Sequence, residues 1–238
     1  MLFVWPLFAF TQDADQMAAD TVKNGYTEEQ QGRFTSEGYY ENGQKTGAWT
    51  SFHPNGVVYT IDNYYQGMKN GVSIQISQRG YLEEQKEYTG GLLNGPFITY
   101  RYGTRMESKI DYKDGEIHGL KRLYYNNGKL QEKSEYVHGK KNGKSLWYTM
   151  DGSLIAEYNY ENDLFEGEQK TFYETGQTMS VSHYQNNIQT GEYREFYEDG
   201  TLKQVGEYRD GKKHGLWKSY DESGEVIGEV KYKKGEIK

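Results

Sequence analysis

A tyrosine recurs every 24 residues along almost the whole of this 238-residue chain, at nine consecutive positions and without insertion or deletion. The series consists of Tyr40, Tyr64, Tyr88, Tyr112, Tyr136, Tyr160, Tyr184, Tyr208 and Tyr232. A repeat this strict predicts an array of identical small units, each packed only against its neighbours.

Glycines repeat with the same period. One series, which includes Gly115 and Gly139, has Asp163 and Asn187 at two of its positions. Asp and Asn are the residues besides glycine that best tolerate positive φ, so this series predicts a left-handed backbone. A second series has no exception: Gly47, Gly71, Gly95, Gly119, Gly143, Gly167, Gly191 and Gly215. A third is broken only at Thr104. So many glycines exclude helices of useful length.

Two short runs separate the glycines in each unit, for example residues 144–148 and 153–160. Asp151-Gly152 between them is typical of a hairpin turn, and residues 136–143 predict a second turn into the next unit. The predicted fold is therefore all-β: one elongated antiparallel sheet of stacked β-hairpins with about eight full repeats.

Apolar side chains also recur within each unit. An aromatic column begins at Phe52 on the first strand, and an aliphatic column begins at Val58 on the second. Together with the tyrosines, these columns predict one continuous apolar seam. At about 4.8 Å per strand, the sheet would be roughly 75 Å long.

The N-terminal residues lack the repeat. Residues 1–11 are almost wholly apolar and are predicted to be either a signal peptide or an apolar cap on the first strand. Residues 12–31 are interpreted as a polar leader, and residues 32–238 as the repeat array. A signal sequence would place the protein outside the cytoplasm, in the periplasm or secreted; without one, a cytoplasmic location is expected.

Composition narrows the function classes. Hydrophobic residues make up only 34% of the chain, yet tyrosine alone occurs 24 times, which favours a thin structure over a disordered one. The formal charge of −7 argues against nucleic acid as a partner. The absence of cysteine excludes disulfides and thiolate zinc sites.

No catalytic or metal-binding pattern emerges. His118 and His214 share a position in the repeat but lie four units apart, and His53, His138 and His183 occupy other positions and units. No two histidines are expected to share a metal, and no cofactor is expected. The carboxylates beside the tyrosine series are interpreted as a solvated face: Glu87, Asp111, Glu135 and Glu207. The Gly139–Gly143 turn lacks a phosphate-binding motif. Catalysis is therefore not expected.

The large aromatic residues on the first strands vary from unit to unit. In repeat proteins, such variable positions usually form the surface that distinguishes one protein from another. They predict a binding surface formed by Trp49, Phe97, Tyr125, Trp147, Tyr173, Tyr193, Tyr197 and Trp217. The alternative is that they form a second apolar layer of the sheet.

Units that read Tyr-x-x-Gly-x-x-x-Gly, then an aromatic residue, then Asn/Asp-Gly-x-Leu and Tyr resemble MORN repeats. They are most similar to the variant class of bacterial YwqK-like proteins, which are often labelled antitoxins. The resemblance covers about residues 32–238. It implies a twisted antiparallel sheet and an interaction or positioning role, and it brings no catalytic residues.

Three hypotheses of function follow. The first is a scaffold for protein–protein interaction, with a toxin as partner if the antitoxin label holds. The second is a secreted or envelope protein that binds glycans. The third is a peripheral binder of membrane lipid, which the acidic net charge opposes apart from a few lysines such as Lys140, Lys141 and Lys144.

Overall fold

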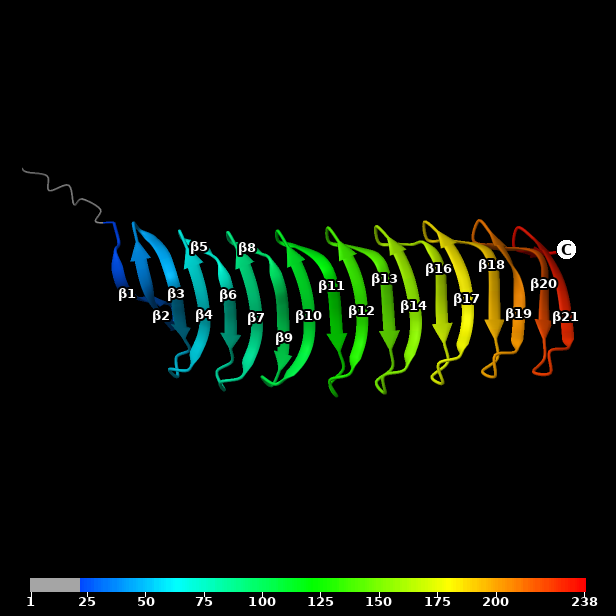
Figure 1. The fold of residues 1–238 in the computed structure, drawn as a ribbon, viewed down its shortest axis with the longest axis horizontal. Coiled ribbons are helices and arrows are strands. Elements are labelled where there is room, and N and C mark those ends of the chain that lie inside the picture. The colour runs from blue at the N-terminus through cyan, green and yellow to red at the C-terminus, as the bar shows by residue number, and fades with distance from the viewer. Residues whose placement is uncertain (1–21) are drawn as a thin grey trace, which may run out of the picture.

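The computed structural model describes residues 22–238, and these form one antiparallel sheet of 22 strands (Figure 1). The strands are β1 (Gly25–Gln31), β2 (Phe34–Glu41), β3 (Gln44–Phe52), β4 (Val58–Tyr65), β5 (Met68–Lys69), β6 (Gly71–Ile76), β7 (Leu82–Thr89), β8 (Leu92–Leu93), β9 (Gly95–Arg101), β10 (Arg105–Lys113), β11 (Glu116–Tyr124), β12 (Leu130–Val137), β13 (Lys140–Tyr148), β14 (Leu154–Glu161), β15 (Leu164–Phe165), β16 (Gly167–Phe172), β17 (Thr178–Gln185), β18 (Ile188–Phe196), β19 (Leu202–Arg209), β20 (Lys212–Tyr220), β21 (Val226–Lys233) and β22 (Glu236–Ile237). The predicted all-β fold is confirmed.

Successive strands pair with one another, so the hairpins follow in chain order along an open sheet (Figure 1). The two-residue strands β5, β8 and β15 each continue, after one residue, as β6, β9 and β16. Each unit therefore supplies two strands to the sheet. Among residues 22–238 there is no helix long and apolar enough to cross a membrane.

The turns along one edge of the sheet are two-residue hairpin turns. In the turn between β12 and β13, His138 and Gly139 both have positive φ, at 49° and 76°. That combination defines a type I′ turn, which matches the twist of the flanking strands. Asp163 and Asn187 have φ of 69° and 66°, so the predicted left-handed series is confirmed.

This turn is shorter than predicted. The sequence suggested a connection over residues 136–143, but β12 runs to Val137 and β13 begins at Lys140. Gly143 thus lies inside a strand. Between Ser134 and Tyr136 on β12 the register against β13 shifts, and Gly143 has a φ of 107°. Such β-bulges take an extra residue in a left-handed conformation, which explains why this glycine series has no exception.

Replacing Gly139 with alanine tests the backbone requirement alone, because a Cβ at this position would meet no atom within 4 Å. We expect Gly139→Ala to lower the free energy of unfolding by about 1–2 kcal/mol. Gly139→Asn is the matched control and should cost clearly less, since asparagine tolerates this conformation. Urea unfolding followed by circular dichroism measures both, and equal losses would contradict a backbone origin.

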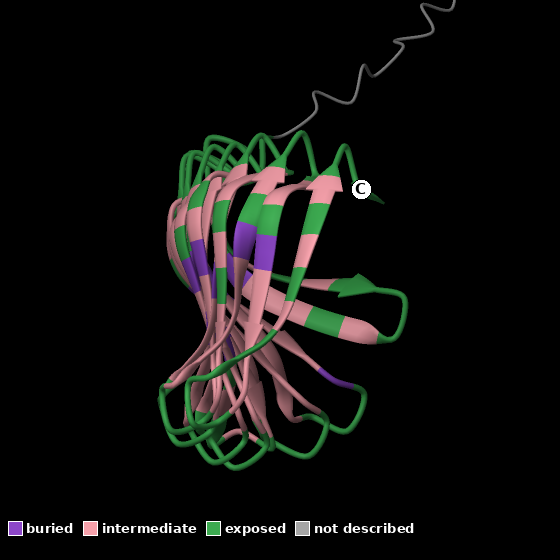
Figure 2. Ribbon diagram, turned by 90° about the vertical axis from the view of Figure 1, so that its right-hand side faces the viewer, coloured by how far each residue is buried: buried purple, intermediate pink, exposed green. Residues whose placement is uncertain are grey.

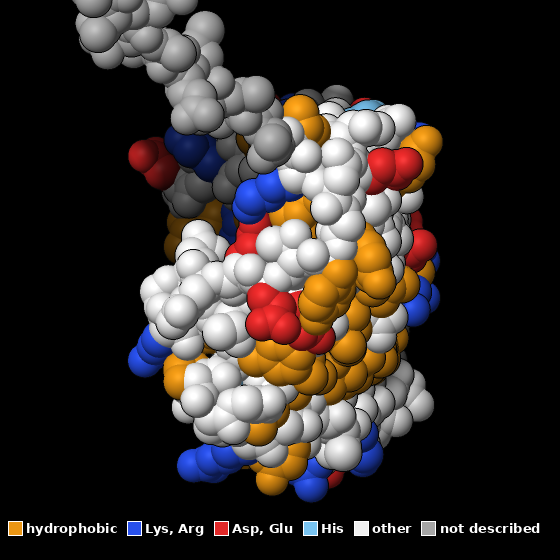
Figure 3. Space-filling view, turned by 90° about the vertical axis from the view of Figure 1, so that its left-hand side faces the viewer, with side chains coloured by type: hydrophobic (Ala, Val, Ile, Leu, Met, Phe, Trp, Pro, Cys, Tyr) orange, Lys and Arg blue, Asp and Glu red, His pale blue; other side chains and the backbone are white. Residues whose placement is uncertain are grey.

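The sheet begins before the predicted repeat array. Residues 25–31 were interpreted as part of a polar leader, but they form β1 and pair with β2. This hairpin departs from the repeat: Gln31 pairs directly with Phe34, and the register shows no bulge. Hydrophobic side chains gather at this end of the sheet (Figure 3), where Tyr26 packs edge-to-face against Tyr39. The predictions for residues 1–11 and the rest of the leader up to residue 21 fall outside the described residues.

The core is a thin strip along the middle of a curved sheet (Figure 2). The buried hydrophobic residues among those described are Trp49, Ile98, Ala156, Val181 and Trp217. The bulges in each unit increase the local twist and so contribute to the curvature.

The single apolar seam is not observed. The aromatic and aliphatic columns do pair across the hairpins, as Phe52 with Val58, but this pair lies at one end of β4 while Tyr64 lies at the other. Six residues of strand separate the two rows by about 20 Å.

Candidate functional site

One face of the sheet carries the repeated tyrosines, and we call it the tyrosine face. On β12, Glu132, Ser134 and Tyr136 alternate along the strand and therefore point to this face. Their partners on β13 are Trp147, Ser145 and Lys141, which point the same way. Apart from the tyrosine itself, the corresponding positions vary in size and charge from unit to unit.

Trp49 and Trp217 form the same core motif near the two ends of the array. Their exposed fractions are 2% and 3%. Each indole lies on a glycine, Gly38 or Gly206, where a Cβ would overlap the ring. Both indole N–H groups donate to backbone carbonyls, at 3.1 and 3.2 Å. These two side chains are therefore buried and expose almost no surface to a partner. Their burial fits the alternative interpretation, in which the aromatic residues of the first strands form an apolar layer of the sheet.

A lysine covers each of these indoles. The Lys45 Nζ lies 3.6 Å from the Trp49 ring centroid, and the Lys213 Nζ lies 3.8 Å from that of Trp217. This cation–π geometry holds the lysine stem over the apolar ring. Burial lowers the pKa of Lys213 below its ordinary value, against a smaller opposing effect of Glu195.

Phe97 and Tyr193 occupy the same position of the repeat as the two buried tryptophans, and both are half-buried. Tyr193 stacks on Trp217 with ring centroids 5.7 Å apart, and the Lys86 Nζ lies 4.8 Å from the Phe97 ring. In the unit of β13 this repeat position holds Ser145, and Trp147 lies two residues after it on the same strand. The predicted aromatic residues are thus spread over several units of the tyrosine face rather than gathered at one place.

Tyr125, Tyr173 and Tyr197 join neighbouring turns. Each hydroxyl donates to the carbonyl of the residue 23 positions ahead, at 2.8 Å in all three cases. The equivalent His53 ring contacts the Ile76 carbonyl at 2.8 Å. These residues connect one repeat to the next along the second edge of the sheet, where the turns are longer than two residues, as at residues 53–57.

Removing one of these hydroxyl groups should weaken the array locally. We expect Tyr173→Phe to cost about 1 kcal/mol, because the Phe196 carbonyl loses its hydrogen bond from Tyr173. Tyr102→Phe is the control, since Tyr102 is 71% exposed and its hydroxyl makes no hydrogen bond with residues 22–238. Thermal unfolding compares the two variants. A loss for Tyr102→Phe as large as for Tyr173→Phe would refute this role.

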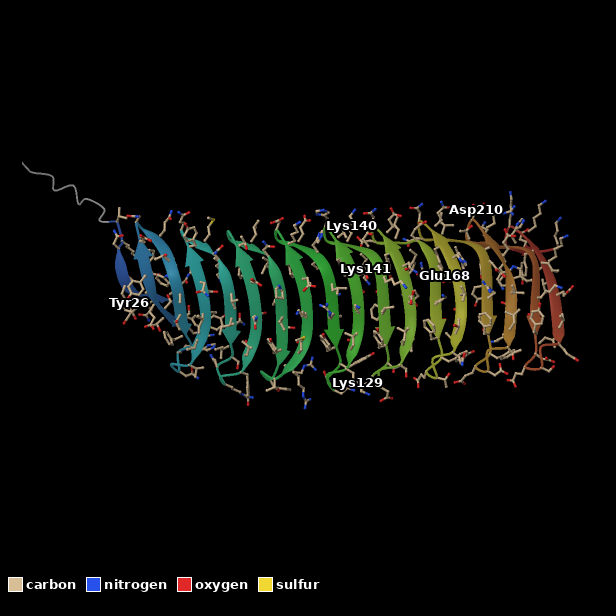
Figure 4. All side chains as sticks on the ribbon, viewed as in Figure 1. Tyr26, Lys129, Lys140, Lys141, Glu168 and Asp210 are labelled. Atoms are coloured by element: carbon tan, nitrogen blue, oxygen red, sulfur yellow. The ribbon has the colours of Figure 1, made fainter. Side chains whose placement is uncertain are left out.

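The middle of the tyrosine face contains a buried charged network. Glu132 is 2% exposed and accepts a 2.7 Å hydrogen bond from Ser134, which in turn contacts Ser145 at 2.5 Å. The Nζ atoms of Lys141 and Lys121 lie 3.2 and 3.5 Å from its carboxylate oxygens. The label for Lys141 in Figure 4 marks this central region.

Several opposing effects set the pKa of Glu132. Burial alone would raise it, but the Ser134 hydrogen bond and the charges of Lys141 and Lys121 outweigh burial, so the pKa lies below its ordinary value. Burial and the nearby Glu132 charge raise the pKa of Tyr136 to about 12. A carboxylate held ionised between two lysines is a structural ion pair; a general acid would need the opposite shift.

His118 and His138 occupy different positions in consecutive units, as the sequence indicated, but the structure brings their ring centroids within 5.3 Å of each other. They lie near consecutive two-residue turns, which stack side by side, and Glu116 lies 3.3 Å from the His138 ring. Among residues 22–238, no group of three His, Cys, Asp or Glu side chains has an arrangement that would hold a metal ion.

The recurring carboxylates beside the tyrosines point to the opposite face and are engaged locally. Asp111 accepts a 3.2 Å hydrogen bond from the Leu120 amide and lies 3.7 Å from Arg122. Glu135 accepts a hydrogen bond from the Lys144 amide at 3.4 Å. No unlike groups converge here for acid–base chemistry.

Besides the hairpin of β1 and β2, the turn between β9 and β10 departs from the repeat. In the other longer turns five residues separate the paired strands, as between Phe52 and Val58. Here Arg101 pairs with Arg105 across only three residues, and Tyr102 adopts a φ of 53°. The displaced glycine at position 103 therefore marks a different, tighter hairpin.

A cavity of about 520 Å³ lies between this turn and the turn at residues 77–81; we call it the break cavity. Ser77 stands where other units carry His53, Tyr125 or Tyr173, so the side chain that would connect the two turns is too small to do so. The lining residues are Ser77, Gln78, Arg79, Tyr81, Glu83, Tyr100, Arg101, Tyr102 and Glu107. None of them belongs to the binding surface predicted from the sequence, although the displaced glycine signalled the position.

A single open sheet with a constant backbone and variable side chains defines a repeat scaffold of the β-hairpin type. Five segments of the chain match the MORN repeat variant: residues 45–64, 117–138, 165–186, 189–210 and 213–234. The break cavity lies in the stretch between the first two matches. No curated protein matches the chain.

Proposed function

We propose that this chain is a non-catalytic MORN-type scaffold that binds another protein through the break cavity. The observation that carries the proposal is the gathering of exposed tyrosine and arginine side chains between the shortened turn at residues 102–104 and the turn at residues 77–81. Tyr81 and Tyr102 are 46% and 71% exposed beside the cavity. Tyrosine and arginine are the residue types that dominate binding energy in protein interfaces.

Binding to an anionic membrane is supported less well. Of the three central lysines singled out from the sequence, Lys141 is paired with Glu132 and Lys144 with Glu157, at 3.2 and 2.6 Å. Lys140 lies in the upper row of turns, far from the turns around the break cavity (Figure 4). Paired lysines contribute little attraction to acidic lipid.

The test is a capture experiment with the immobilised full chain and a lysate of the source cells. Tyr81→Ala combined with Tyr102→Asn removes both rings, and asparagine suits the positive φ of residue 102. We expect one or a few proteins to be retained by the unmodified chain and reduced at least tenfold by the double variant.

Tyr65→Ala is the matched control, because Tyr65 is 61% exposed but lies at the other edge of the sheet. It should leave the retained proteins unchanged. Equal retention by all three forms, or no specific retention by any, would reject the proposal. A retained protein encoded beside this gene that inhibits growth when expressed alone would support an antitoxin-like role.

A location outside the cytoplasm is also a proposal. It follows from the apolar residues 1–11 and their resemblance to a signal peptide. N-terminal sequencing of the mature protein tests it: a start after residue 11 is expected, and retention of Met1 in a cytosolic fraction would reject it.

A further inference from the structure

The arginine side chains around the break cavity differ in whether they are free to bind a ligand. The Arg101 guanidinium is bonded to Glu107 and Asn126, and Arg105 donates to the Asn126 carbonyl at 3.1 Å. Arg79 is exposed on the opposing turn, and its guanidinium makes no hydrogen bond or ion pair with any residue in the range 22–238. Arg79 is therefore the cavity's free cation within the described part of the chain.

Two carboxylates lie in the cavity wall. Glu107 is paired with Arg101, whereas Glu83 accepts a 3.1 Å hydrogen bond from Gln75 and has no cationic partner among residues 22–238. Because the Glu83 charge remains in the wall, a dianionic group such as phosphate would be repelled more strongly than a single carboxylate. The cavity thus suits a monoanion at Arg79.

Both walls are fixed before any ligand arrives. The Tyr81 amide donates to the Ser77 hydroxyl at 3.0 Å, and Asn55 of the preceding turn donates to the Gln78 carbonyl at 3.0 Å. On the other side, Arg105 is bonded to the following turn. A preorganised wall loses little conformational entropy on binding, which favours specific recognition.

From this arrangement we infer that the break cavity binds an extended peptide segment through one acidic side chain and an adjacent apolar side chain. Arg79 binds the carboxylate, with the two-point geometry that guanidinium and carboxylate groups favour. The exposed rings of Tyr81 and Tyr102 contact the apolar neighbour. This inference rests on the proposed function and specifies the chemistry of the partner.

The probe is a library of random dodecapeptides displayed on phage and selected on the immobilised full chain. Among the peptides selected on the unmodified chain, we expect Asp or Glu next to an apolar residue to be enriched at least fivefold over the starting library. Arg79→Gln should abolish the acidic preference but keep the apolar one, since the guanidinium is lost and both rings remain. Arg209→Gln, an exposed arginine near the other end of the array, should behave like the unmodified chain.

Synthetic peptides from the enriched pool measure the effect by fluorescence anisotropy. Changing the acidic residue to its amide should weaken binding to the unmodified chain about tenfold or more and have little effect on binding to Arg79→Gln. Two outcomes would overturn the inference. One is that a peptide with phosphoserine in place of the acidic residue binds more tightly than the acidic peptide. The other is that vesicles of acidic lipid bind more tightly and compete with the peptide for the same residues.

Failure of this inference is distinguishable from failure of the proposed function. If no acidic preference appears, or if it survives in Arg79→Gln, the carboxylate assignment is wrong. The capture experiment with the tyrosine variants then still reports whether the cavity binds a protein by other contacts.

Discussion

Replacing Trp217 with alanine is expected to lower the free energy of unfolding by about 3–5 kcal/mol. Trp217 is 3% exposed, and its ring contacts Tyr193, Tyr208 and Tyr232 with centroids 5.2–6.2 Å apart. Residues 22–238 form a single sheet, so no second layer from this part of the chain can close over the space left by the indole, and the apolar contacts would not be recovered. Urea unfolding followed by far-ultraviolet circular dichroism measures the loss.

Met150→Ala is a suitable control, because Met150 is 57% exposed at a turn. Its cost should stay below about 0.5 kcal/mol. A similar cost for both substitutions would show that the indole is not part of the core.

A double-mutant cycle tests the contact between Trp217 and Gly206. The φ of Gly206 is not in the left-handed region, so alanine is excluded there only by overlap with the indole. Gly206→Ala alone should cost about 1–3 kcal/mol. In the Trp217→Ala background the overlap is gone, and the same change should cost much less. Additive costs would contradict the packing of indole on glycine.

The second large effect is expected at Glu132. Glu132→Gln should cost about 3 kcal/mol at neutral pH, because Lys121 and Lys141 lose the carboxylate that neutralises them. Both lysines are about one-fifth exposed, at 23% and 21%, so water relieves part of the penalty. Glu229→Gln is the control: its pair with Lys218 is exposed, and we expect less than about 1 kcal/mol.

The Glu132 contribution should also depend on pH. Its pKa is lowered in the folded protein, so the carboxylate contributes stability fully above its ordinary value of 4.5. That contribution is lost as the pH falls below 4.5 and through the lowered folded pKa. The difference in stability between the unmodified chain and Glu132→Gln should therefore shrink below pH 4.5, and a constant difference down to pH 2 would contradict it.

The repeat pattern predicted the fold because each local signal recurred many times. Asp163 and Asn187 in a glycine series indicated a left-handed backbone, and the observed φ values confirm it. The 24-residue period predicted hairpins in succession, and the strands follow it from β2 to β21. Local rules are sufficient in such an array because every strand pairs with its sequence neighbours.

The candidate site was less predictable. The sequence suggested the large aromatic residues of the first strands, yet Trp49 and Trp217 are buried because Gly38 and Gly206 opposite them leave space for an indole. Which side chains lie opposite one another depends on bulges that shift the register between strands. Because a one-residue shift of register moves the side chains of a strand to the other face, the bulges decide which face an aromatic side chain joins.

The sequence by itself determined the period, the presence of two turns in each unit, the left-handed positions and the all-β character of the repeat array. Only the tertiary structure decided that β1 extends the sheet outside the repeat, that His118 and His138 lie side by side, and that a small Ser77 beside a tightened hairpin leaves a cavity. The physical reason is that backbone conformation depends on local residues, whereas a surface depends on side chains 20 to 24 positions apart, which the stacking of repeats brings together.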